Sequence, residues 1–103
     1  MKSRIAIPTE EIADFCRRWQ ISELAFFGSV LREDFLPDSD VDVLVRFDVK
    51  ARHTLFDMVR MQEELQRILG RQVDLVSRRG IEASRNYLRK NEILKSAEVV
   101  YAA

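Results

Sequence analysis

Two aspartates at the start of an apolar run constrain this chain more than any other feature. Asp40 and Asp42 stand one residue apart, and the apolar run 43–45 follows them directly. Aspartate is depleted in β-strands, so two of them at this point need a physical reason. Because side chains two residues apart in a strand lie on the same face, the pattern predicts two carboxylates side by side.

A cation between the two carboxylates would relieve their repulsion. Like charges this close raise each other's pKa unless a cation lies between them. Mg²⁺ commonly takes one or two carboxylates and completes its coordination with substrate phosphates. The pair therefore predicts a magnesium site, although an isolated Asp-x-Asp also occurs in solvated turns.

A Gly-Ser pair lies upstream of the aspartates. Gly28 and Ser29 follow the apolar run 24–27, and ten residues separate Ser29 from Asp40. A phosphate can approach the backbone at Gly28 because glycine has no Cβ, and a helix beginning at Ser29 would direct its free N–H groups at that phosphate. Gly-Ser alone is equally compatible with an ordinary turn. Together, in this order, the two motifs predict a site for a nucleoside triphosphate and its metal.

With these motifs the chain resembles the minimal nucleotidyltransferases, small relatives of DNA polymerase beta, over about residues 9–101. Gly28 and Ser29 match the Gly-Ser of that family, and the segment 39–42 matches its Ser-Asp-hydrophobic-Asp core. The third acidic residue of the family lies on a later strand, where Asp74 fits. The resemblance implies a polymerase-beta-type nucleotidyltransferase fold, in which Asp40 and Asp42 are catalytic and hold two Mg²⁺ ions together with Asp74.

The resemblance also assigns nucleotide-binding residues. It implies ATP as the substrate, bound by Gly28, Ser29 and Arg32. Arg32 stands where the family often has arginine, and it would either neutralise the triphosphate or brace the acidic loop by an ion pair. Glu33 departs from the pattern, because many relatives carry glycine there.

The C-terminal segment 91–101 resembles that of MntA-like antitoxins of HEPN/MNT toxin–antitoxin systems. This resemblance implies transfer of AMP from ATP to a tyrosine hydroxyl of a HEPN ribonuclease toxin. Two alternatives stay open: an antitoxin or binding module that acts by occlusion without catalysis, and nucleotidyl transfer to RNA or a small molecule.

Composition bounds the class of protein. A length of 103 residues predicts one domain over 1–103, and 47% hydrophobic with 33% charged residues is typical of a soluble globular protein. We expect no membrane span, since no apolar segment approaches about 18 residues. The single cysteine, Cys16, excludes an internal disulfide and fits a reducing cytoplasm. His53 is the only histidine, which argues against a zinc site, and we expect it in a surface loop.

Charge is balanced overall but unevenly distributed. The formal net charge of zero does not favour nucleic acid as a direct partner. Residues 33–48 hold six acidic residues against one arginine, whereas residues 78–95 hold six basic residues against two acidic ones. The basic segment could meet a triphosphate, RNA or an acidic partner surface, or could form a solvated helix face. The oligomeric state stays open.

Periodicity predicts an α/β chain with a small mixed β-sheet flanked by helices. The expected strands cover 24–27, 41–47 and 73–76. One expected helix begins near Thr9, which would serve as its N-cap, and others cover 29–35 and 55–69. The apolar period of the helix over 55–69 runs through Leu55, Val59, Leu65, Ile68 and Leu69 with one polar interruption at Gln62, and Gly70 ends the helix. We expect helical structure after Gly80, with a last amphipathic helical stripe formed by Leu94, Ala97, Val100 and Tyr101.

Overall fold

The computed structural model describes residues 8–28, 40–83, 85 and 87–103. Ser29, Arg32 and the helix expected over 29–35 lie outside these residues. In chain order the elements are α1 (Thr9–Arg18), β1 (Ile21–Phe27), β2 (Val41–Phe47), α2 (Leu55–Leu69), β3 (Val73–Ser77), α3 (Arg78–Glu82), α4 (Tyr87–Ser96) and β4 (Glu98–Ala102). None of the helices described is long and apolar enough to cross a membrane.

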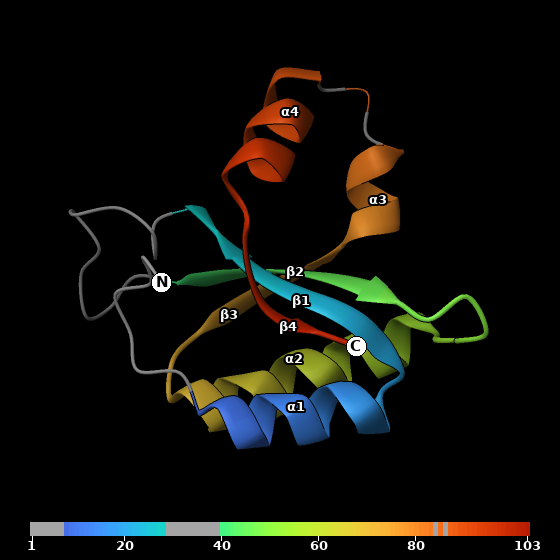
Figure 1. Cartoon of the computed structure of the whole chain (residues 1–103), viewed down its shortest axis with the longest axis vertical. Helices are drawn as coiled ribbons and strands as arrows, with labels where there is room; N and C mark the ends of the chain where they lie inside the picture. Colours follow the sequence, from blue (N-terminus) through green and yellow to red (C-terminus); the bar gives the residue numbers. More distant parts are fainter. Residues whose placement is uncertain (1–7, 29–39, 84, 86) are drawn as a thin grey trace.

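The four strands form one mixed sheet in the order β3-β2-β1-β4. Strands β2 and β3 are parallel, while β1 is antiparallel to both β2 and β4. Figure 1 shows α1 and α2 side by side on one face of the sheet and α3 and α4 on the other. The expected small mixed sheet flanked by helices is therefore confirmed.

The larger part of the core lies between the sheet and the helices α1 and α2. Val41, Val43 and Val45 alternate along β2 and are fully buried in one cluster with Met61 and Leu65 of α2. Burying such side chains contributes roughly 1.5–3 kcal/mol each. Since strand side chains alternate, this arrangement directs the intervening residues of β2 to the opposite face.

A smaller core lies on that opposite face, under α3 and α4. Ala25 and Phe27 of β1, Leu44 of β2 and Ile93 of α4 are buried together there. Asp42 lies two residues from Leu44 on the same strand, so its side chain belongs to the same face, at the end of this cluster. The burial of the three valines of β2 thus decides that Asp42 lies on the face covered by α3 and α4.

The bounds expected for the long helix are confirmed, but its buried face differs from the expectation. A capping box between Thr54 and Asp57 begins α2, and Gly70 ends it with φ of 68°. The apolar period suggested Leu55 and Val59 as core residues, yet their exposed fractions are 86% and 55%. Each helical residue advances by about 100°, so Val59 lies nearly opposite the buried Met61.

Only Leu94 of the expected C-terminal stripe is helical, and the helical interpretation was wrong for Val100 and Tyr101, which lie in a strand. Helix α4 ends at Ser96, and β4 pairs antiparallel with β1, with Leu24 opposite Tyr101. Valine and tyrosine are enriched in strands, and β1 would otherwise present an open edge on this side. A pattern of four apolar positions did not distinguish the two periods, whereas the available partner strand did.

Helix α1 begins differently from the expectation and is tied to α2. Thr9 is its first helical residue, and the N-cap is Pro8, without a side-chain cap bond. At the other end, Arg18 forms an ion pair with Glu64 of α2. Trp19 Nε1 also donates to Glu64 Oε1 at 3.2 Å. The hydrogen bond from Arg18 holds the pKa of the Glu64 carboxyl below its usual range.

His53 lies in the loop before α2, as expected, but the expectation that it is on the surface was wrong. Its side chain is 13% exposed, its ring centroid lies 4.8 Å from that of Phe47, and it also contacts the Trp19 ring. Its Nε2 is 2.6 Å from the carbonyl oxygen of Trp19, within hydrogen-bond distance. His53 therefore packs the loop before α2 onto the end of α1, which is a structural role.

Candidate active site

Two of the predicted carboxylates lie side by side on neighbouring strands. In the parallel pair of β2 and β3, Asp42 is in register with Asp74. Residues paired in this way present their side chains on the same face of the sheet. Asp42 is half-buried and Asp74 is exposed. Asp40 is exposed and directly precedes β2, at the same end of the sheet.

The glycine of the predicted phosphate turn contacts the same carboxylate. Gly28 directly follows β1 with φ of 73°, and Phe27 before it pairs with Asp42. A Cβ at Gly28 would lie 2.2 Å from Asp42 Oδ2, closer than atoms can approach. Only glycine therefore leaves room for the Asp42 carboxylate in this geometry. The structure brings Gly28 and Asp74 next to Asp42, and Asp40 directly precedes the same strand.

The donor chemistry of Asp42 and Asp74 fits Mg²⁺ bound partly by the protein and partly by other ligands. Among the residues that the structure describes, no group of three or more His, Cys, Asp or Glu side chains is gathered closely enough to hold a metal ion. Mg²⁺ is usually bound through one or two carboxylates, with substrate phosphates and waters as the other ligands. Asp42 and Asp74 supply that number. The convergence of Asp40 with them on one metal stays a prediction.

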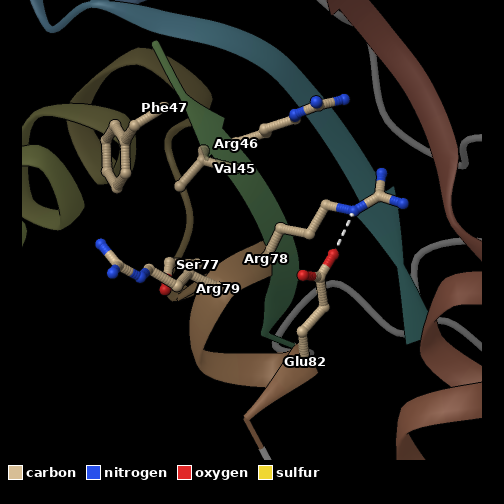
Figure 2. Close-up of a pocket in the computed structure, with 7 residues that line it drawn as sticks. All are labelled: Val45, Arg46, Phe47, Ser77, Arg78, Arg79 and Glu82. Atoms are coloured by element: carbon tan, nitrogen blue, oxygen red, sulfur yellow. Dashed lines mark hydrogen bonds and ion pairs between the residues drawn. The ribbon is translucent and has the colours of Figure 1, made fainter. Parts of the chain in front are cut away.

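A separate hollow lies at the other end of β2 and β3 (Figure 2). It has a volume of about 220 Å³ and is lined by Val45, Arg46, Phe47, Ser77, Arg78, Arg79 and Glu82. Figure 2 shows the Arg46 and Arg79 side chains extending to opposite sides. Arg78 is held by Glu82 at 3.0 Å. Because the arginines do not converge on one point, this hollow is a poorer triphosphate site than the opposite end of the sheet, the acidic end, which carries Asp42 and Asp74.

Two glutamines near the acidic end were missed by the sequence reasoning as site residues. Gln66 Oε1 accepts a hydrogen bond from the Val73 N–H at 3.2 Å, and Gln62 Oε1 accepts one from the Leu75 N–H at 3.3 Å. For Gln62, the available signal was the polar interruption of an otherwise apolar helix face. Both amides bond the strand that carries Asp74.

Comparison with known proteins establishes the family. A family model described as a nucleotidyltransferase domain matches residues 10–100. The chain belongs to the nucleotidyltransferase domain family. The matched region contains all the predicted site residues.

Two relatives of this nucleotidyltransferase are named protein adenylyltransferases. The protein adenylyltransferase MntA of Thermococcus cleftensis is 32% identical over 78 residues, which are 76% of this chain and 77% of the relative. A protein of Methanocaldococcus jannaschii, provisionally named a protein adenylyltransferase, is 31% identical over 64 residues. That second match covers 62% of this chain and spans 64% of the relative's length.

Solved structures agree with the fold. A structure provisionally described as a minimal nucleotidyltransferase has a TM-score of 0.67 at 33% identity, covering 87% of this chain and 86% of that one. A toxin–antitoxin complex with AMP-PNP has a TM-score of 0.70 at 16% identity, covering 94% and 75%. A complex of tri-AMPylated Shewanella oneidensis HEPN toxin with its MNT antitoxin has a TM-score of 0.62 at 16% identity, covering 92% and 70%. At 16% identity, the two complexes show the fold alone.

Proposed function

We propose that this nucleotidyltransferase transfers AMP from ATP to a tyrosine hydroxyl of a HEPN ribonuclease toxin and thereby acts as an antitoxin. The observation that carries the proposal is the register of Asp42 with Asp74 beside Gly28. The acceptor is suggested by the relatives named protein adenylyltransferases and by the AMPylated HEPN toxin in one structural neighbour. ATP as donor is in keeping with AMP-PNP in another.

The acidic end of the sheet would hold the triphosphate through a metal and a turn. Asp40, Asp42 and Asp74 would hold Mg²⁺, which when bound supplies positive charge that neutralises the triphosphate and its leaving group. Gly28 leaves its backbone open to the phosphates, and the Ser29 hydroxyl would donate one further hydrogen bond.

The transfer itself is a displacement at the α-phosphorus. The tyrosine oxygen forms a bond to this phosphorus while the bond from the phosphorus to the bridging oxygen of the β-phosphate breaks. Pyrophosphate leaves, and the hydroxyl proton passes to the Asp74 carboxylate, which is exposed to an incoming acceptor. Alignment and charge stabilisation would supply most of the rate, since the protein forms no covalent bond itself.

An assay with purified toxin tests this function. Incubation with ATP and Mg²⁺ should add one or more adenylate masses to the toxin, and amounts of this chain well below one per toxin should suffice. Asp42→Asn should lower the rate by roughly 10²-fold or more, since it removes a metal ligand and a charge aimed at the transferred group. Asp48→Asn is the matched control, because Asp48 lies in the exposed turn after β2 and accepts the Lys50 N–H.

Neutralisation by occlusion would give a different result. In that case the Asp40→Ala, Asp42→Ala double variant would protect fully at about one copy per toxin, with no mass change. The activity of the toxin would also return when the two proteins are separated. That combination would refute the proposed transfer.

A further inference from the structure

Strand β3, which carries Asp74, lies at an edge of the sheet, and β2 is its one partner among the strands that the structure describes. Backbone N–H groups alternate in direction along a strand, so an edge strand directs every second N–H away from the sheet. An exposed edge is open to fraying and to pairing with other chains. In this five-residue strand the outward groups include the N–H of Val73 and of Leu75, the two residues that flank Asp74.

Helix α2 supplies an acceptor for each of these two N–H groups. Gln66 Oε1 accepts from Val73 at 3.2 Å, and Gln62 Oε1 accepts from Leu75 at 3.3 Å. The two glutamines are four residues apart and therefore lie on the same helix face, one above the other. The Val73 and Leu75 side chains are buried, with exposed fractions of 4% and 9%.

The two amides thus hold the backbone immediately before and immediately after Asp74. On its other side, this stretch of β3 pairs with β2, where Asp42 stands opposite Asp74. The short strand is therefore hydrogen-bonded along both edges around Asp74, the residue whose carboxylate lies in register with Asp42.

We propose that Gln62 and Gln66 are positioning residues, which hold the exposed Asp74 carboxylate in register with Asp42. The proposal rests on the proposed function for what Asp74 does. An amide oxygen suits this task because it accepts a hydrogen bond from an N–H group without adding a further negative charge near Asp42 and Asp74.

Hydrogen exchange tests the two hydrogen bonds from β3 to Gln62 and Gln66, which together form the glutamine clamp, and it needs no activity assay. Gln62→Met and Gln66→Met keep much of the side-chain volume and remove the acceptor. The amides of Leu75 and Val73, respectively, should exchange at least about tenfold faster in these variants. Gln72→Met is the matched control, because Gln72 is exposed and directly precedes β3, and it should leave both amides unchanged. Unchanged protection in both clamp variants would overturn the proposal.

Kinetics tests whether the clamp acts through Asp74. In the Gln62→Met, Gln66→Met double variant we expect kcat to fall at least about tenfold, with the KM for ATP changed less than about threefold. Gln62→Glu and Gln66→Glu keep an acceptor oxygen, so the Leu75 and Val73 amides should keep their slow exchange, even though each change adds a negative charge near Asp74. In an Asp74→Asn background, the double Met change should lower kcat no further. If the double variant does not fold, the two single variants carry the same comparisons.

The outcomes separate a positioning role from a structural one. Faster exchange at Val73 and Leu75 with unchanged kcat, or equal losses of kcat with and without the Asp74 carboxylate, would overturn the proposal. If the wild-type chain transfers no AMP at all, the proposed function fails. The ¹³Cγ resonance of Asp74 then replaces kcat as the readout, and it should shift or broaden in the clamp variants but not in Gln72→Met. An unmoved resonance would overturn the clamp.

Discussion

Replacing Gly28 by alanine tests how closely the Asp42 carboxylate approaches the backbone at the end of β1. The residue has φ of 73°, a conformation that costs an L-residue about 1–2 kcal/mol. The new Cβ would also lie 2.2 Å from Asp42 Oδ2, so the carboxylate must leave its rotamer. An off-rotamer side chain costs about 0.5–1.5 kcal/mol. The expected loss of unfolding free energy in Gly28→Ala is therefore about 1.5–3.5 kcal/mol.

Gly70 provides a control for the backbone part of this cost. Its φ is 68°, but a Cβ there would meet nothing within 4 Å. Gly70→Ala should thus cost only the conformational strain, about 1–2 kcal/mol. Alanine also lowers the entropy of the unfolded chain, but equally at both positions, so this contribution cancels in the comparison.

Urea unfolding of five proteins, the wild type among them, would isolate the contribution of this contact. Gly28→Ala should shift the midpoint more than Gly70→Ala at an unchanged m-value. In an Asp42→Ala background the excess cost of Gly28→Ala should disappear. Equal costs for the two glycines, with no dependence on Asp42, would refute the close approach of Gly28 to this carboxylate. Gly28→Ala should also lower AMP transfer, because Asp42 is displaced.

Three further measurements follow from the helices. Thr54→Ala removes the capping box of α2 and should lower the unfolding free energy by about 1 kcal/mol in urea titrations; no change would mean that the cap is not formed. The hydrogen bond from the Thr54 N–H holds the pKa of Asp57 below its usual range. The hydrogen bond from Arg18 does the same to the pKa of Glu64. Groups lowered in this way stabilise the folded state above the ordinary carboxyl pKa, so Tm should fall as the pH drops below about 4, and less steeply in Glu64→Gln. Burial raises the pKa of the Cys16 thiol to about 12, so the folded protein should react with iodoacetamide at least about tenfold more slowly than the urea-unfolded chain; equal rates would contradict the burial.

Local patterns sufficed for much of the candidate site. Asp40 and Asp42 at the head of β2 were recognised from strand periodicity, and Gly28 from the turn that follows an apolar run. The bounds of α2 followed from its period and from Gly70 at its end. These features depend on neighbours within a few residues, where side-chain spacing and backbone conformation are fixed by covalent geometry.

Long-range packing fixed the remainder. Asp74 lies thirty-two positions after Asp42 by residue number, and its place beside Asp42 depends on the parallel register of two strands that a helix connects. The segment Glu98–Ala102 is a strand because β1 offers it an edge, although its apolar spacing also fitted a helix. Gln62 was a polar interruption in the sequence and became a bond to β3 once α2 packed against that strand. In each case the free energy comes from contacts between distant segments, and periodicity within one segment carries no information about its partner.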